Sequence, residues 1–488
     1  MTGATGFVGR ALVQRLLGAG HSVTALVRDT KRARDRLGPD VQLCDAADGE
    51  MSWAVSLSGC DAVVNLAGES LLGGPWTKTR RKALWSSRVN LTQKLVAAMA
   101  LADPVPRTLI SASAVGYYGE RGSEPLLESS SHGSSYLAQM CVAWEQAAAA
   151  ASSHGVRVVH LRIGIVLGLD GGALAAMLPA FKLGLGGPLG DGLQYMPWIH
   201  LEDLVGIILR GLRDERLSGA FNANAPTPVT SREFARALGG VINRPARLRV
   251  PAFALKLLLG ARAQLPLQSQ RTLPDALERL GHNFQHPQLT SALEALLAVP
   301  ATVKLRRAAK DERSDLPRRP GYVLEHRSHL HVPLSAAFAF FCKAQNLGLL
   351  TPSWMRFAMM SEPPRELASG TELNYRIGLG PLPMRWKTII ERWTPPSGFV
   401  DTQAVGPYAL WWHEHHLEAV GDETDMVDRV YYTPPFGLLG RLAHPILIAP
   451  MLRAIFAYRA AATERLFGPE AARVQRPAPP QVLRRGQA

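Results

Sequence analysis

Residues 2–20, TGATGFVGRALVQRLLGAG, contain glycines at positions 3, 6 and 9 and then a segment whose apolar residues repeat at helical spacing. Glycine permits a tight turn and a close approach of the backbone to a phosphate. The free amides and the dipole of the following helix stabilise the phosphate charge. The stretch therefore predicts a dinucleotide-binding loop, formed by Gly3, Thr5, Gly6, Phe7, Val8 and Gly9.

A strand-like run, SVTALVR, follows this predicted helix and ends at Arg28, nineteen residues after Gly9. In dinucleotide-binding folds an acid at this strand end binds the ribose 2′-hydroxyl, whereas a base accepts a 2′-phosphate. Arg28 is followed by cations at positions 31, 32 and 34, so the sequence favours NADP over NAD as the cofactor. The alternative is that these cations only form the solvated start of a helix.

Three more strand-like runs, DAVVNLAG, RTLISASA and VRVVHLRIG, alternate with helix-length amphipathic segments. This alternation predicts an α/β Rossmann domain, with a doubly wound parallel sheet, over residues 1–240. A phosphate loop normally follows a first strand, but here the chain begins at the loop, so we expect that strand to be truncated. Either the natural start lies upstream of Met1, or the central strand is missing and the nucleotide binds poorly.

The composition of the rest of the chain predicts four further segments. Leu-rich runs with several prolines over 241–300 predict a helical part of the first domain. Residues 301–320, with seven Lys/Arg and three Asp/Glu, have the composition of a charged linker. Strand-like segments and a long closing helix predict an α+β domain with a mostly antiparallel sheet over 321–468. The tail, 469–488, is expected to be disordered.

Charge and cysteine content narrow the class of protein. The formal net charge is +14, but residues 301–320 contribute +4 and the four arginines of residues 471–488 another +4. The remaining charge is too dilute for a nucleic-acid surface. The four cysteines lack CxxC spacing, which argues against a structural zinc site or a disulfide framework. The apolar runs are too short and too interrupted to span a bilayer, so we expect a cytoplasmic protein without stable membrane insertion.

Seven motifs occur in order along residues 1–297. They are TGATGFVG, NLAGES (65–70), SRVNLTQKLV (87–96), SASAVGYYG (111–119), LRIGIVLG (161–168), GGPLGDGLQYMPWIHLEDLV (186–205) and FNANAP (221–226). Together they resemble the epimerase-like family of extended short-chain dehydrogenases/reductases. The resemblance implies that Asp45 lies near the adenine and that Ser113 is the active-site serine. It also implies a second cofactor loop, formed by Asn65, Leu66, Ala67 and Gly68.

Dehydrogenases of this class use a tyrosine with a lysine four residues later. Tyr136, 23 residues after Ser113, is the candidate tyrosine, but Met140 stands at the lysine position. Without the ammonium group the phenol should keep a pKa near ~10, which makes it a poor base at neutral pH. Two hypotheses follow. The first is an NADP-dependent oxidoreductase or epimerase of a small organic or nucleotide-linked substrate, with catalytic Ser113 and Tyr136. The second is a catalytically degenerate nucleotide-binding sensor or scaffold.

Six other residues are candidates: Tyr117 and Tyr118 follow the active-site strand, and the other four lie in segments that the family arranges around its pocket. Four of them also have a structural interpretation: Tyr118 as a packed aromatic, Cys141 as a small buried hydrophobe, Glu145 as a helix-surface charge and His200 as a loop anchor. The six candidates are Tyr117, Tyr118, Cys141, Glu145, His200 and Asp203.

The C-terminal segments PLSAAFAFF, LTPSWMRF, PLPMRWKTII, FVDTQAVGPYALWWHEHHL and VYYTPPFG resemble the START-like (SRPBCC, helix-grip) superfamily. The resemblance implies a curved antiparallel sheet that grips a long helix around an apolar ligand. Fusions of this kind are sometimes described as cell-division inhibitors, which would make the sensor hypothesis a regulatory one.

Two residue groups in this half have alternative interpretations. On a strand, His413 and His415 share one face and His416 points to the other, so only two ligands meet and no metal is expected. Five aromatics either line a cavity or fill a core. They are Trp386, Trp393, Tyr408, Trp411 and Trp412.

Overall fold

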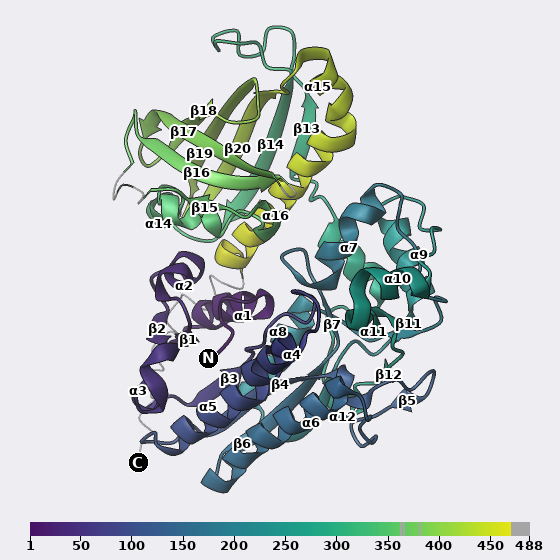
Figure 1. Ribbon diagram of the computed structural model, residues 1–488. Coiled ribbons are helices and arrows are strands. Elements are labelled where there is room, and N and C mark those ends of the chain that lie inside the picture. Colours follow the sequence, from purple (N-terminus) through teal and green to yellow (C-terminus); the bar gives the residue numbers. More distant parts are fainter. Residues whose placement is uncertain (362–363, 365–366, 380–381, 470–488) are drawn as a thin grey trace, which may run out of the picture. The chain divides into compact units, whose positions relative to one another are not determined.

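The computed structural model describes residues 1–361, 364, 367–379 and 382–469 (Figure 1). The chain divides into two compact units, which we call the N-terminal and C-terminal units. The first comprises Met1–Arg15 and Val23–Ala298, and the second comprises Leu16–Ser22 and the chain from Val299 onward. Apart from residue 469, the predicted disordered tail lies outside the described residues.

Thirteen helices of the described chain lie wholly or mainly in the N-terminal unit. They are α1 (Phe7–Gly18), α2 (Thr30–Leu37), α3 (Gly49–Leu57), α4 (Lys78–Trp85), α5 (Leu91–Ala100), α6 (Tyr136–Ala149), α7 (Gly172–Lys182), α8 (Leu201–Arg213), α9 (Ser231–Val241), α10 (Ala252–Leu259), α11 (Gln264–Leu267), α12 (Asp275–Arg279) and α13 (Leu289–Leu297). Several begin where the sequence supplies a capping side chain. Thr230 and Glu233 form a capping box at α9, and Ser135 caps α6.

The strands of this unit are mostly short and parallel. They are β1 (Thr24–Val27), β2 (Gln42–Asp45), β3 (Ala62–Asn65), β4 (Thr108–Ala114), β5 (Pro125–Leu126), β6 (Arg157–Ile163), β7 (Ile165–Leu167), β8 (Tyr195–Met196), β9 (Trp198–His200), β10 (Gly219–Ala223), β11 (Val229–Thr230) and β12 (Arg271–Thr272). The four predicted strand-like runs contain β1, β3, β4 and β6. Strands β2 and β10, which flank them, were not among the predictions.

The main sheet has the predicted parallel arrangement. Strands β3, β4, β6 and β10 form one part and β1 and β2 the other, all paired in parallel. The two parts are joined through Thr2, which bridges Leu26 of β1 and Asn65 of β3. The central position, where the sequence predicts a truncated first strand, is thus held by Met1 and Thr2.

Helices cover both faces of this sheet because successive residues of a strand point to opposite sides. On β4, Leu109 packs with Leu95 of α5 and with α3 in one core cluster. The next residue, Ile110, points the other way, and a Cβ on Gly211 of α8 would lie 3.0 Å from its Cδ1. The doubly wound architecture follows from this alternation.

The C-terminal unit is built on an eight-stranded antiparallel sheet in the order β13-β14-β20-β19-β18-β17-β16-β15. Its strands are β13 (Val303–Arg307), β14 (Tyr322–Leu330), β15 (Ala358–Met359), β16 (Glu372–Leu379), β17 (Leu382–Thr394), β18 (Gly398–Val405), β19 (Leu410–Val420) and β20 (Glu423–Thr433). Its helices are α14 (Leu334–Phe341), α15 (Gly437–Ala443) and α16 (Ala449–Phe467). This is the predicted α+β arrangement with a long closing helix.

The structure differs from the sequence prediction over residues 301–320. Residues 303–307, assigned to a charged linker by composition, form strand β13 and pair with β14. Val303 is buried, whereas Lys304 and Arg306 are exposed. Leu316, further along the same segment, is also buried. Charged side chains are common on edge strands, where they prevent pairing with other chains. The linker prediction for residues 303–307 is therefore wrong, because an edge strand and a linker can have the same composition.

One helical stretch of the described chain, Gly437–Phe467, is long and apolar enough by composition to cross a membrane. Its second half is a core helix of the C-terminal unit, because Leu452, Phe456 and Arg459 of α16 are buried there. Its first half carries exposed apolar side chains, among them Leu438, Leu439 and Leu442. The stretch therefore meets the length and composition criteria for a membrane span, although its second half is a core helix of the C-terminal unit.

Candidate functional site

The glycine loop lies between Thr2 and helix α1, and two of its glycines leave no space for a side chain. Gly3 has a positive φ of 68°, and a Cβ there would lie 2.6 Å from the carbonyl carbon of Leu66. A Cβ on Gly9 would lie 2.1 Å from the oxygen of Gly3. Gly6 donates its N–H to Gly3 O at 2.9 Å. The loop is thus a tight turn pressed against the segment that follows β3.

The other predicted loop residues support this turn. The Phe7 ring packs on a glycine-rich segment after β7, where a Cβ on Gly168 would lie 2.5 Å from its Cζ. The Thr5 carbonyl accepts a hydrogen bond from Arg36 Nη1 at 3.4 Å. Val8, the second residue of α1, is partly buried.

The second predicted loop, Asn65–Gly68, is fixed by a buried hydrogen-bond network. Asn65 Oδ1 accepts the Thr2 hydroxyl proton at 2.7 Å, and its Nδ2 donates to Thr92 Oγ1 at 2.8 Å. The Ala67 N–H donates to Thr2 Oγ1 at 3.1 Å. Asn65 is buried, with 1% of the residue exposed, and its side-chain amide is fully engaged in these hydrogen bonds. It therefore positions the loop that Leu66, Ala67 and Gly68 form.

Arginines gather beside the two loops. Arg28, just after β1, reaches Glu69 next to the second loop, with Nη1 2.9 Å from Oε1. Burial, together with the nearby positive charges of Arg32 and Arg10, lowers the pKa of Arg36. These four residues, Arg10, Arg28, Arg32 and Arg36, are called the arginine group below.

The acids near the strand ends have local roles. Asp29 follows Arg28, and its Oδ1 accepts the N–H of Arg32 at 2.9 Å, which caps helix α2. Asp45, the last residue of β2, accepts the N–H of Ala47 at 2.9 Å. Asp29 is therefore used as a helix cap, and Arg28 is left as the charged side chain at the end of β1.

Ser113, on β4, lies in a buried ionic network. Its hydroxyl donates to Glu145 Oε1 at 2.6 Å. Arg162 of β6 binds the same carboxylate through two hydrogen bonds, Nε to Oε1 and Nη2 to Oε2, both at 2.9 Å. The interpretation of Glu145 as a helix-surface charge is therefore wrong, because its side chain is only 11% exposed and paired. An arginine inside the apolar run VVHLRIG was the available signal for this pair.

Tyr117 and Tyr118 extend this network. The Arg162 guanidinium lies 3.5 Å from the centroid of the Tyr117 ring. The Tyr118 hydroxyl accepts from Arg162 Nη1 at 3.0 Å and donates to Asn222 Oδ1 at 2.7 Å. Burial raises the pKa of Tyr118 to about 12, so it is a protonated, packed aromatic at neutral pH.

Tyr136 opens helix α6 and uses a different partner. Its hydroxyl donates to the Arg81 carbonyl at 2.8 Å, so it and the Ser113 hydroxyl are not bonded to each other. Burial raises the pKa of Tyr136, although Arg81 and Arg88 oppose that rise. Met140, at the lysine position, is 2% exposed. Burial also raises the pKa of Cys141 to about 12, which makes it an inert thiol.

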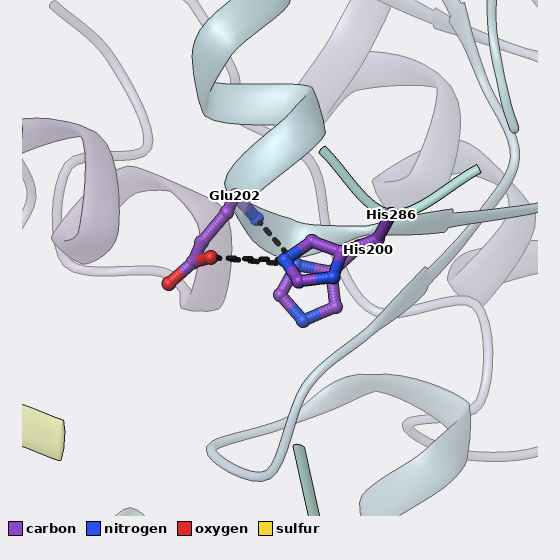
Figure 2. Close-up of side chains that lie close together, drawn as sticks. All are labelled: His200, Glu202 and His286. Atoms are coloured by element: carbon purple, nitrogen blue, oxygen red, sulfur yellow. Dashed lines mark hydrogen bonds and ion pairs between the residues drawn. The ribbon is translucent and has the colours of Figure 1, made fainter. Parts of the chain in front are cut away.

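A polar cluster lies at the start of helix α8 (Figure 2). His200 Nδ1 accepts the backbone N–H of Glu202 at 3.2 Å, and His286 Nε2 lies 3.1 Å from Glu202 Oε2. Burial and the neighbouring His286 lower the pKa of His200 to about 4, so its ring is neutral at pH 7. Asp203 accepts the N–H groups of Gln285 and His286. His200 and Asp203 therefore act as a helix cap and a segment anchor.

The N-terminal part of the chain is similar to known proteins. A family model described as the NAD dependent epimerase/dehydratase family matches residues 1–223, and a domain of unknown function, DUF1731, matches residues 250–296. The chloroplastic epimerase family protein SDR39U1 homolog of Arabidopsis thaliana is 41% identical over 300 residues, covering 61% of this chain and 86% of that protein. The chain belongs to the NAD-dependent epimerase/dehydratase family.

Two further relatives each match about 60% of this chain. Epimerase family protein Mb2239 of Mycobacterium bovis is 40% identical over 294 residues, covering 60% of this chain and 95% of that protein. The crystal structure of human epimerase family protein SDR39U1 (isoform 2) with NADPH has 34% identity and a TM-score of 0.55. It covers 60% of this chain and 97% of that one. The N-terminal unit is thus an extended short-chain dehydrogenase/reductase fold.

The C-terminal unit of this family member contains a cavity of about 170 Å³ bounded by sheet strands, α14 and α16. Of the five aromatics in question, Trp386, Tyr408 and Trp411 line it. Trp393 packs in the core, and Trp412 lies outside the cavity beside Arg313. As predicted, His413 and His415 are buried on one face of β19, while the side chain of His416 is 61% exposed.

Three groups in the described part of the chain have ligand atoms close enough for a metal ion. They are His200 with Glu202 and His286, His329 with His331 and Glu423, and Asp401 with His413 and His415. The third group contains an acid that sequence reasoning missed. Asp401 stands directly opposite His413 on the neighbouring strand, and strand register of that kind is not visible in sequence spacing.

Proposed function

We propose that the N-terminal unit binds NADP(H) and acts as an oxidoreductase or epimerase on a small organic or nucleotide-linked substrate. The tight loop at Gly3 and Gly9 carries the proposal, because a side chain at either position would clash with backbone. Such a loop lets backbone amides bind a pyrophosphate, and the nicotinamide, when bound, supplies hydride transfer. The arginine group favours the 2′-phosphate of NADP, in keeping with the NADPH in the human relative's structure.

We expect Arg28→Asp to erase the preference for NADPH. The variant replaces a charge-assisted contact with repulsion, so NADPH affinity should fall about ten- to a hundredfold while NADH affinity changes little. Fluorescence titration with both nucleotides measures the ratio. Lys94→Asp, the same charge change on an exposed residue of α5, is the matched control. An unchanged NADPH/NADH ratio in Arg28→Asp would remove the basis of the NADP assignment.

A catalytically degenerate sensor is the second candidate, and two observations favour it. Ser113 is held by Glu145 rather than by a catalytic tyrosine. Tyr136 has buried Met140 in place of the lysine that would lower its pKa. In this candidate, nucleotide binding changes the state of the protein without turnover. Its output would be regulatory and would pass through the C-terminal unit.

Turnover separates the two candidates. For the enzyme, NADPH should be oxidised with at least one member of a broad carbonyl panel, and Tyr136→Phe should lower kcat about 100-fold, within the range of proton-transfer contributions. Ser113→Ala should also lower it, while NADPH affinity stays unchanged. Gln139→Ala, on the same helix, is the control for local disturbance. Binding of NADPH without turnover across the panel would favour the sensor.

For the C-terminal unit, we propose a START-like, helix-grip domain that binds a compact apolar ligand. The antiparallel sheet, the long helix α16 and the aromatic-lined cavity support the proposal. A cavity of about 170 Å³ suits a body of one or two rings, since a cavity of roughly 150 Å³ binds benzene. We also infer a reducing, cytoplasmic setting, in keeping with four free cysteines.

Naphthalene is the simplest probe of this cavity. Because a compound that binds only the folded state stabilises it by mass action, saturating naphthalene should raise the melting temperature of the C-terminal transition in the full chain by a few degrees. Tryptophan emission should shift with it, since Trp386 and Trp411 line the cavity. If neither the melting temperature nor the emission responds, the cavity is closed to apolar ligands.

A further inference from the structure

One wall of the C-terminal cavity is ionic. Asp401 on β18, His413 and His415 on β19 and Asp428 on β20 lie on three neighbouring strands. Asp401 is directly opposite His413, and His415 is directly opposite Asp428. Because His413 and His415 are two residues apart on one strand, all four side chains share one face of the sheet. We call these four residues with Arg459 the ionic wall.

His415 bridges the two acids of the ionic wall. Its Nε2 is 2.9 Å from Asp401 Oδ2, and its Nδ1 is 2.6 Å from Asp428 Oδ1. Burial acts to lower the pKa of His415, but Asp428 and Asp401 raise it by more. The two acids thus favour the protonated form of the ring, which is hydrogen-bonded to Asp401 through Nε2 and lies within ion-pair distance of Asp428.

Arg459 reaches the ionic wall from helix α16. Its Nε is 2.7 Å and its Nη2 3.5 Å from the carboxylate oxygens of Asp428. The guanidinium is buried, with 8% of the residue exposed, and it lines the cavity. Within the described part of the chain, its Nη1 has no hydrogen-bond partner. The guanidinium thus keeps an unused donor in the lining of a largely apolar cavity, which also contains Lys343 and the acids and histidines of the ionic wall.

His413 is the proton acceptor that remains in the ionic wall. Its Nδ1 is 3.4 Å from Asp401 Oδ2 and its Nε2 3.5 Å from Asp428 Oδ1, both too long for strong hydrogen bonds. Burial and the charge of His415 lower its pKa, so it is neutral at pH 7. Arg459, together with His415 when its ring is protonated, opposes the charge of the two acids.

We propose that this cavity binds a compact, largely apolar carboxylate, with its anionic group on Arg459 Nη1 and with His413 taking up a proton as it binds. The inference rests on the proposed ligand-binding function of the cavity. A guanidinium edge is the usual protein partner of a carboxylate. The added negative charge raises the pKa of His413, and the proton that His413 takes up offsets that charge.

The groups that face His413 come from every element around it. They are Asp401 on β18, His415 on β19, Asp428 on β20 and Arg459 on α16. Tyr375 on β16 interacts electrostatically with Asp401, and His326 on β14 interacts with Asp428 and Arg459. Burial raises the pKa of Tyr375 and lowers the pKa of His326, so both side chains are uncharged at pH 7. A metal ion is a poorer occupant of the ionic wall, because it would displace the His415 proton and sit beside the Arg459 cation.

The test uses the full chain with a matched pair of probes, 2-naphthoate and naphthalene. Calorimetry and tryptophan emission should give 2-naphthoate a Kd at least tenfold lower at pH 6.5. Because His413 is neutral in the free protein and protonated in the complex, 2-naphthoate affinity should rise by up to tenfold per pH unit from pH 8 to pH 6. Naphthalene affinity should not. Titrations in buffers of different ionisation enthalpy should show uptake of up to one proton.

Variants isolate Arg459. Because Arg459→Gln alone removes the arginine partner of buried Asp428, the informative variant is the double exchange Arg459→Gln with Asp428→Asn. It should bind naphthalene as the natural chain does and lose the preference for 2-naphthoate. Equal affinity of the natural chain for both probes would overturn the carboxylate inference and leave the cavity function standing. If neither probe binds, the cavity function fails with it. Tight, stoichiometric Zn²⁺ binding that is lost in His415→Ala would also overturn it.

Discussion

Gly9→Ala should abolish measurable dinucleotide binding, a loss of at least 100-fold. A Cβ at this position would lie 2.1 Å from the Gly3 oxygen and 2.9 Å from Ala4 Cα. Both are backbone atoms, so the clash cannot be relieved by a side-chain rotation, and the loop must move away from the position that binds phosphate. NADPH fluorescence titration measures the loss, and circular dichroism reports whether the fold persists.

Gly18→Ala is the matched control for this prediction. Gly18 ends the same helix, and a Cβ there meets nothing within 4 Å. The control should keep full NADPH affinity and gain some stability, up to about 1 kcal/mol, because alanine has less freedom in the unfolded chain. If Gly9→Ala binds NADPH within threefold of the natural chain, the loop is not the nucleotide site.

The second large effect is expected at Arg162. Arg162→Met should destabilise the N-terminal unit by about 3–5 kcal/mol, because it leaves the Glu145 carboxylate buried without a partner. The double variant Arg162→Met with Glu145→Gln should recover most of that loss, since it removes both charges. Urea unfolding of the three proteins gives the free energies of unfolding.

Arg121→Met is the contrasting control. Arg121 pairs with Glu124 at the surface, where solvent screens the charges, so its loss should change stability little. If Arg162→Met is as mild as Arg121→Met, the buried pair is not a main support of the sheet. A double variant that is no more stable than Arg162→Met would assign the cost to packing instead of charge.

In the C-terminal unit, the sequence predicts which face of a strand a side chain lies on, but it does not predict which strands pair. The alternation of His413, His415 and His416 predicts which two rings turn inward, because side chains of a strand alternate between faces. The acids that meet them lie on β18 and β20, and only the pairing register brings Asp401 and Asp428 into line. Strand β13 was missed for the same reason. Its charged composition is that of a linker, and only its pairing with β14 identifies it as a strand.

By itself, the sequence determined the Rossmann architecture and the glycine loop that we propose binds the cofactor phosphates. Both depend on local properties: glycine spacing, strand and helix periodicity, and the cations that follow β1. Only the tertiary structure decided that Ser113 bonds to Glu145, that Tyr136 turns to the Arg81 carbonyl and that Arg459 faces a cavity. These contacts join residues far apart in the chain. Their formation depends on how sheets and helices pack, and no local pattern encodes that packing.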